Sequence, residues 1–396
     1  MSEYQYYEFA MADRPMTDDE MDMMESLSSR AEVTPYRASY VYNYGDFRGE
    51  PRELLEEHFD AMFHIANWGT VWLMFKLPLS AVDLERMREY VVEHEVDVYA
   101  SGESVIVSVL ADEMDLGWVE GEGYLDMLLP LREALLNGDL RMLYVAWLGC
   151  QGVWEEEGEL DDPVEVPVPP GLQEHDSALE TVAQLFEVEK FLVQAAAEES
   201  PPMPSSSPES LAHRVRQMPE EERVDFLVRI ASGEARVGSV LRRRLELLAT
   251  ADEDDRWAPA RPGRTVRQLT ERAEALARLD AHRRRKEKEA QLQARLRQIT
   301  TRWEYHWNWV EEILKTTSGS AYDRASKLVV ELHQAARQEN MEEQLNSRMR
   351  AFFRNHGHRP KLVERLRHAN IVPLNSGAML WDEPKMRRPG PSTPVR

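Results

Sequence analysis

The residue types best suited to chemistry are the single cysteine and the paired histidines. Cys150 follows the apolar run "LRMLYVAWLG" and precedes an acidic stretch, whereas a reactive thiolate needs a basic or helix-N-terminal setting. We therefore expect Cys150 to be a buried structural residue. His58 and His64 lie on an expected helix, where their spacing places them about 120° apart around the axis, too far to share a metal ion.

His356 and His358 form an H-x-H pair in "RNHGHRP", but a metal site needs third and fourth ligands that the sequence does not nominate. We expect a helix-terminal turn there. A single cysteine in 396 residues excludes a zinc site built from several cysteines. The sequence also lacks a phosphate-binding loop, a dinucleotide-binding glycine fingerprint, an HExxH helix and a nucleophile elbow. We predict no catalytic residue, no cofactor and no metal ion.

A basic stretch between residues 256 and 304 holds 14 Lys and Arg against 6 Asp and Glu. Its densest part is Arg283, Arg284, Arg285 and Lys286, which could follow the phosphates of a nucleic acid. The alternative, which we favour, is a solvated helix face whose cations pair with carboxylates one turn away or with the acidic N-terminal half. No known nucleic-acid-binding module surrounds the stretch.

The stretch "TRWEYHWNWVEEIL" concentrates aromatic side chains, and an a/d heptad rhythm runs through it at Leu292, Leu296, Ile299, Trp303, His306, Val310 and Ile313. This seam, residues 292–314, could pair with a second copy, with a partner, or with the helices that follow it. The short connection "TTSGS" favours packing within the chain. We expect Trp303 and Trp307 to be core residues, and Tyr305 and Trp309 to form a partner-binding surface.

The net charge of −23 is divided unevenly between the two halves of the chain. Residues 1–200 carry 11 basic and 44 acidic side chains, whereas residues 201–396 carry 37 basic and 27 acidic ones. Such a division indicates two different classes of surface. No apolar run approaches the roughly 20 residues that span a bilayer. The first residues lack the basic and apolar regions of a signal peptide. We expect a cytoplasmic protein without membrane contact.

Residues 1–150 alternate strand-like and helix-like segments, and the pattern predicts an α+β domain with a mainly antiparallel sheet. Thr17 and Glu20 have capping-box spacing, and Gly102 with Glu103 marks a hairpin turn. A helix is expected from Pro51 to "HIANWG", closed by Gly69. The C-terminal half is predicted to be all-α, with one long amphipathic, coiled-coil-like helix whose middle is either a solvated bridge or a break. The predicted parts are an acidic α+β domain (1–150), an acidic Pro-rich linker or surface loop (151–175), a small helical module (176–250), a long basic helix (251–317), a helical C-terminal module (318–372) and a disordered basic tail (373–396).

Two segments resemble known bacterial proteins. The run from "AYDRASKLVVELHQAARQ" to "HGHRPKLVERLRHANIV" is similar to the helical tail of bacterial SWIM-type zinc-finger proteins, and that from "YYEFAMADRPMTDDEM" to "FDAMFHIANWGT" resembles an uncharacterised bacterial family. The zinc finger itself needs several cysteines and this chain has only Cys150, so no zinc ligand is carried over. The resemblance implies a bacterial source and a shared helical module.

Three functions follow as hypotheses. The first is a non-enzymatic interaction or scaffold protein, a component of a larger bacterial assembly, acting through its acidic α+β domain and its helical C-terminal surfaces. The second is an accessory nucleic-acid-binding protein that uses the basic helix 256–304. The third is an enzyme of unrecognised type with its site in the α+β domain. The absent catalytic motifs favour the first.

Overall fold

The computed structural model describes residues 3–114, 117, 120–151, 162–203, 208–233, 237–247 and 259–371. The chain divides into two compact units, Met1–Arg278 (unit 1) and Leu279–Arg396 (unit 2). The predicted tail, 373–396, and most of the acidic segment 151–161 lie outside the described residues.

Unit 1 is built on a seven-stranded sheet in which each pair of neighbouring strands is antiparallel, which confirms the predicted α+β class. The strand order is β2-β3-β1-β4-β5-β7-β6. The strands are β1 (Gln5–Ala10), β2 (Glu32–Thr34), β3 (Arg37–Tyr42), β4 (Ala61–Ala66), β5 (Val71–Pro78), β6 (Val96–Ser101) and β7 (Ser104–Ala111). β6 and β7 are joined through Gly102 and Glu103, as the sequence predicts.

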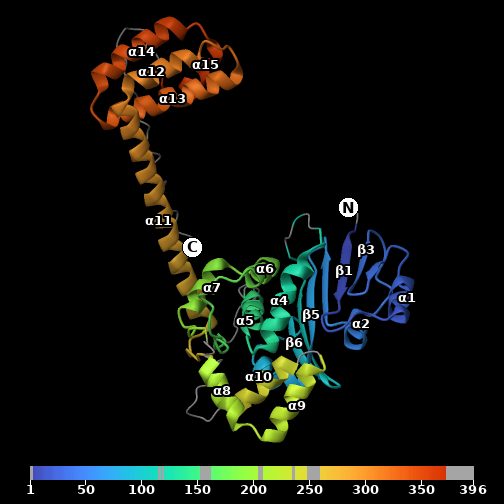
Figure 1. Ribbon diagram of the computed structural model, residues 1–396. Coiled ribbons are helices and arrows are strands. Elements are labelled where there is room, and N and C mark those ends of the chain that lie inside the picture. Colours follow the sequence, from blue (N-terminus) through green and yellow to red (C-terminus); the bar gives the residue numbers. More distant parts are fainter. Residues whose placement is uncertain are drawn as a thin grey trace, which may run out of the picture. The chain divides into compact units, whose positions relative to one another are not determined.

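Helices cover both faces of this sheet (Figure 1). One face packs against α4 (Tyr124–Leu136), α5 (Arg141–Cys150), α6 (Ser177–Leu185) and α7 (Lys190–Ala197). The other packs against α1 (Asp18–Ser26) and α2 (Pro51–Glu57). The capping box of Thr17 and Glu20 starts α1. The short helices η1 (Leu79–Ala81) and α3 (Leu84–Arg88) follow β5. Because both faces are covered, the central strands are buried on both sides.

The helix predicted from Pro51 to Gly69 is wrong in its second half. The helix α2 ends at Glu57, and Ala61–Ala66 is strand β4, paired with β1 and β5 and buried along its whole length. A strand covered on both faces has no alternation of polar and apolar residues, so its apolar run reads like a buried helix. Gly69 does not cap a helix. It turns the chain between β4 and β5 with φ +100°, where a Cβ would lie 2.5 Å from the backbone of Met114.

The Pro-rich segment, predicted to be a linker or surface loop, is packed at residues 165–172 and exposed at residues 173–175. Val168 is fully buried, and isolated β-bridges join Val164 to Thr265 and Val168 to Ala260. The segment "VEVPVPPG", in which valine alternates with other residues, is therefore extended and packed against the rest of unit 1.

Three helices, α8 (Pro208–Gln217), α9 (Glu220–Ala231) and α10 (Val237–Leu247), complete unit 1 with a small core of their own. The long helix α11 (Val266–Thr301) begins in unit 1 and contains the boundary between the units. Its first turns are packed there, since Leu269 and Ala273 are buried in the main core. Arg264, just before α11, contacts the buried carboxylate of Glu165 at 2.5 Å.

The middle of α11 is an unbroken, solvated bridge, because residues 281–290 are helical and all exposed. The predicted continuous helix breaks later, at Arg302, whose φ of −116° and ψ of 38° leave the helical region. Unit 2 then consists of α12 (Trp303–Ile313), α13 (Gly319–Gln338), α14 (Glu342–His356) and α15 (Pro360–His368) around one apolar core. The all-α C-terminal half is confirmed. No helix of the part that the structure describes is long and apolar enough to cross a membrane.

Candidate interaction site

The aromatic cluster of α12 divides as the sequence predicts. Trp303 and Trp307 are buried, their ring centroids are 5.9 Å apart, and Trp307 packs against Phe352 at 6.1 Å. Tyr305 and Trp309 are 61% and 45% exposed. Their exposure leaves these two side chains accessible to a partner, but their role in partner binding stays a prediction.

The heptad seam packs within unit 2. Its members from Leu296 to Ile313 are buried or half-buried, most of them against α13, α14 and α15, and only Leu292 is exposed. The seam therefore packs within the chain, as the short connection predicted, and its buried side chains are not free to pair with a second copy.

Three of the four residues of the basic cluster pair with carboxylates of their own helix. Arg283 and Arg284 both contact Asp280, the latter at 2.7 Å, and Arg285 contacts Glu289 at 3.0 Å. The partners lie one helical turn apart and the three arginine side chains are exposed, so these pairs contribute little to stability. The arrangement agrees with the solvated helix face that we favoured, and a nucleic-acid role stays a prediction.

A charge reversal tests that role. Because the guanidinium groups already have carboxylate neighbours, we expect the chain to give no gel shift with duplex DNA or RNA at about 0.15 M salt, where contacts with phosphates are screened. The variant with Arg283, Arg284, Arg285 and Lys286 all changed to Glu should behave identically. A shift that the wild-type chain gives and this variant loses would establish nucleic-acid binding instead.

Cys150 and Glu56, two titratable residues of unit 1, make contacts that stabilise the fold. Burial raises the pKa of Cys150 to about 12, and its thiol donates to the carbonyl of Ala146, as befits a structural residue. On α2, the carboxylate of Glu56 accepts hydrogen bonds from the Tyr99 and Ser101 hydroxyl groups of β6, both at 2.7 Å. These two bonds lower the pKa of Glu56, so the group stays ionised and is poorly suited to act as a general acid.

His64 lies on strand β4 rather than on a helix with His58. Its Nδ1 is 3.0 Å from the carbonyl oxygen of Tyr6, and its ring stacks on Tyr7 with centroids 3.9 Å apart. Burial lowers the pKa of His64 to about 4. His356, predicted to lie in a helix-terminal turn, ends α14 and contacts Glu311 at 2.7 Å. Among the described residues, no group of three or more His, Cys, Asp or Glu could hold a metal ion.

The buried state of His64 predicts a pH dependence of stability. The unfolded histidine titrates near ~6.5, so between about pH 6.5 and 4 the unfolded chain binds more protons than the folded chain. The contribution of His64 is complete above about pH 6.5 and is lost as the pH falls to 4, by about 3 kcal/mol at ~1.36 kcal/mol per pKa unit. We expect His64→Phe to flatten the pH dependence of urea unfolding in this window. Parallel curves for the two proteins would contradict this. His333, whose pKa burial also lowers to about 4, is present in both and cancels in the comparison.

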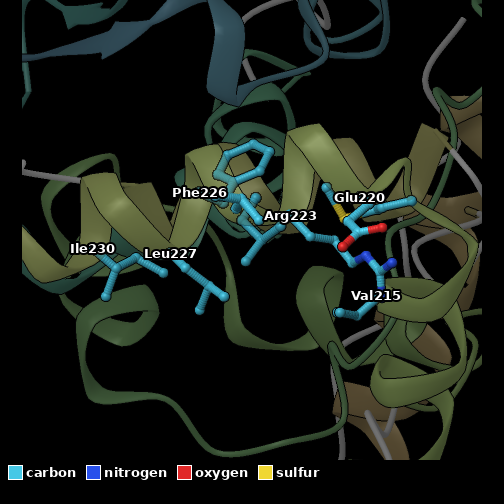
Figure 2. A pocket seen from close by; sticks show the side chains of 9 residues that line it. Val215, Glu220, Arg223, Phe226, Leu227 and Ile230 are labelled. Atoms are coloured by element: carbon cyan, nitrogen blue, oxygen red, sulfur yellow. The ribbon is translucent and has the colours of Figure 1, made fainter.

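The surface that the fold leaves most clearly unburied lies on α9 (Figure 2). Phe226 points inward and packs with Met218, Val237 and Leu245. Elsewhere on the same helix, Val224, Leu227, Val228 and Ile230 are 53%, 65%, 59% and 49% exposed. A cavity of about 370 Å³ adjoins them, lined by Val215, Met218, Glu220, Arg223, Val224, Phe226, Leu227, Ile230 and Leu241. We call this cavity and the exposed apolar face of α9 the α9 groove.

Arg223 gives the α9 groove a polar feature. Its Nε is buried and has no hydrogen-bond partner among the described residues. In Figure 2 the side chain extends along the cavity toward Val215. This site is not among those predicted from the sequence. The signal was present in "RVDFLVRIA", where apolar residues occupy two sides of one short helix, a pattern that requires burial on both.

Comparison of the chain with protein-family models, with curated proteins and with solved structures gave no match.

Proposed function

We propose that the protein is a non-enzymatic interaction protein that binds a protein partner through the α9 groove, as a component of a larger assembly. The observation that carries this proposal is the exposure of four large apolar side chains within seven residues of α9, next to a cavity. Leaving this area in water costs free energy that a partner would recover by covering it.

The remaining features support binding rather than chemistry. Among the described side chains, the thiol of Cys150 is buried and its pKa is raised, and the ionised Glu56 is held by neighbouring hydroxyl groups. Tyr305 and Trp309 on α12 provide a second exposed surface, in unit 2. Exposed aromatic residues of this kind are enriched where proteins bind one another.

A crosslinking experiment in the host cell tests the proposal. A photoreactive amino acid replaces Leu227 in the full chain, and in a matched control it replaces Leu279, which is 61% exposed on α11. We expect a discrete covalent adduct with one protein at position 227 and none at position 279. If position 227 gives no adduct, or the same adducts as position 279, the proposal is wrong. A third chain labelled at Trp309 shows whether unit 2 contacts the same partner.

A further inference from the structure

We propose that the α9 groove binds an amphipathic helix of a protein partner, and that this helix places a carboxylate against Arg223. This inference rests on the proposed function and specifies the partner's chemistry. It follows from the spacing of the exposed side chains, from the backbone around the groove, and from the charge in its lining.

The spacing fits a helix. Val224, Leu227, Val228 and Ala231 are exposed and stand at positions i, i+3, i+4 and i+7, so they form one stripe along α9. A stripe of this period is the surface that a second helix packs against, ridge into groove. With 12 residues, α9 is about 18 Å long at ~1.5 Å per residue, which matches about three turns of a partner helix.

The backbone of the groove also favours a helix over an extended peptide. The cavity is lined from α8, α9 and α10, whose amide and carbonyl groups are used within the helices. An extended peptide would need main-chain partners that this surface does not offer, whereas a helix satisfies its own main chain. The partner therefore contributes side chains only.

Charge identifies the polar contact. Glu222 is engaged by Arg244 at 3.0 Å, and Arg229 contacts Asp225 at 3.6 Å and lies over the ring of Phe226. The cavity lining holds one cation, Arg223, and one carboxylate, Glu220, and the buried Nε of Arg223 lacks an acceptor among the described residues. A carboxylate on the partner would reach the guanidinium group of Arg223 through its terminal nitrogens and accept charge-assisted hydrogen bonds there.

The same charges disfavour a membrane as the occupant. A helix that lies on an anionic bilayer carries Lys and Arg beside its apolar face. The polar positions of α9 are Glu220, Glu221, Glu222 and Asp225 against Arg223 and Arg229. An anionic bilayer would meet this net acidic helix along its whole length and be repelled, whereas a single carboxylate of a partner helix would meet only Arg223.

The test is a selection from a phage-displayed library of 16-residue helical peptides on the full chain. We expect the selected peptides to carry apolar residues at i, i+3 or i+4, and i+7, with Asp or Glu at one flanking position. Leu227→Asp should weaken their binding at least tenfold, and Leu279→Asp should leave it unchanged. Because Leu227 and Leu279 are both largely exposed, neither variant should alter the circular dichroism spectrum.

A double-mutant cycle tests the contact with Arg223. Arg223→Gln and replacement of the peptide's acid by its amide should each weaken binding about tenfold, and the two changes together should do no more than either alone. Independent effects, or basic flanking residues, would overturn the inference and leave the proposed function standing. Failure to select any peptide sensitive to Leu227→Asp would overturn it too. A dimer in solution that Leu227→Asp dissociates would identify the occupant as a second copy of this chain.

Discussion

Arg132→Ala is expected to lower the free energy of unfolding of unit 1 by about 3–5 kcal/mol, the typical cost of breaking a buried ion pair by removing one partner. Arg132 is 2% exposed. Its Nε donates to the carbonyl oxygens of Lys76 and Asp60, and one terminal nitrogen is 3.3 Å from the carboxylate of Asp60. The variant leaves that carboxylate and both carbonyl groups buried without this donor.

Urea unfolding measures this effect, with hydrogen exchange of the β4 amides assigning the loss to unit 1. The matched control is the double variant Arg132→Met and Asp60→Asn, in which neither charge remains buried alone. It should be more stable than Arg132→Ala by about 1–3 kcal/mol, because the unpaired carboxylate causes much of the loss. A variant Arg132→Ala with the stability of the wild-type chain would show that the guanidinium group is not needed to join the sheet to α4.

Trp307→Ala is expected to lower the stability of unit 2 by about 3–5 kcal/mol, the usual cost of deleting a buried large aromatic side chain. Trp307 is 3% exposed and contacts both Trp303 and Phe352, so its removal leaves a cavity where α12 meets α14. Urea unfolding with hydrogen exchange of the α13 amides measures the loss in unit 2.

The control for Trp307 lies two residues further along the same helix. Trp309 is 45% exposed, so Trp309→Ala should change the free energy of unfolding by no more than about 0.5 kcal/mol. The two variants delete the same side chain, which isolates the effect of burial. Equal losses would mean that Trp309 also belongs to the core of unit 2, and would remove it as a candidate for partner binding.

The elements predicted best were those whose pattern depends on one local rule. Three features were predicted correctly: the capping box of Thr17 and Glu20, the Gly102–Glu103 turn, and the division of the α12 aromatics into buried and exposed sides. Each depends on helix periodicity or turn chemistry, which act over a few residues. Strand β4 was not predicted, because a strand buried on both faces lacks the alternation of polar and apolar residues that identifies strands.

The polar interior of unit 1 was beyond prediction for a different reason. Arg132 meets Asp60, which is 72 residues away, and nothing local pairs them. A partial signal exists, since Arg132 lies within the apolar stripe of α4 between Leu128 and Leu136. A cation in such a position requires a buried partner, but the sequence alone does not say which carboxylate supplies it. Likewise, apolar residues on two sides of α9 are a signal of an extra contact that we did not use, and they say nothing of the cavity beside the helix.

Because the first turns of α11 pack in the core of unit 1, they determine where the chain can be cut to give a fragment that folds. A fragment ending at residue 250, the predicted end of the small helical module, would lack Leu269 and Ala273, which fill the main core. It would also lack Arg264, leaving the buried Glu165 without its cation. An autonomous N-terminal fragment therefore has to keep the first turns of α11, to about Arg278. The first turns of α11 are thus part of the core of unit 1, whereas residues 281–290 of the same helix are exposed, so we expect these two parts to tolerate mutation very differently.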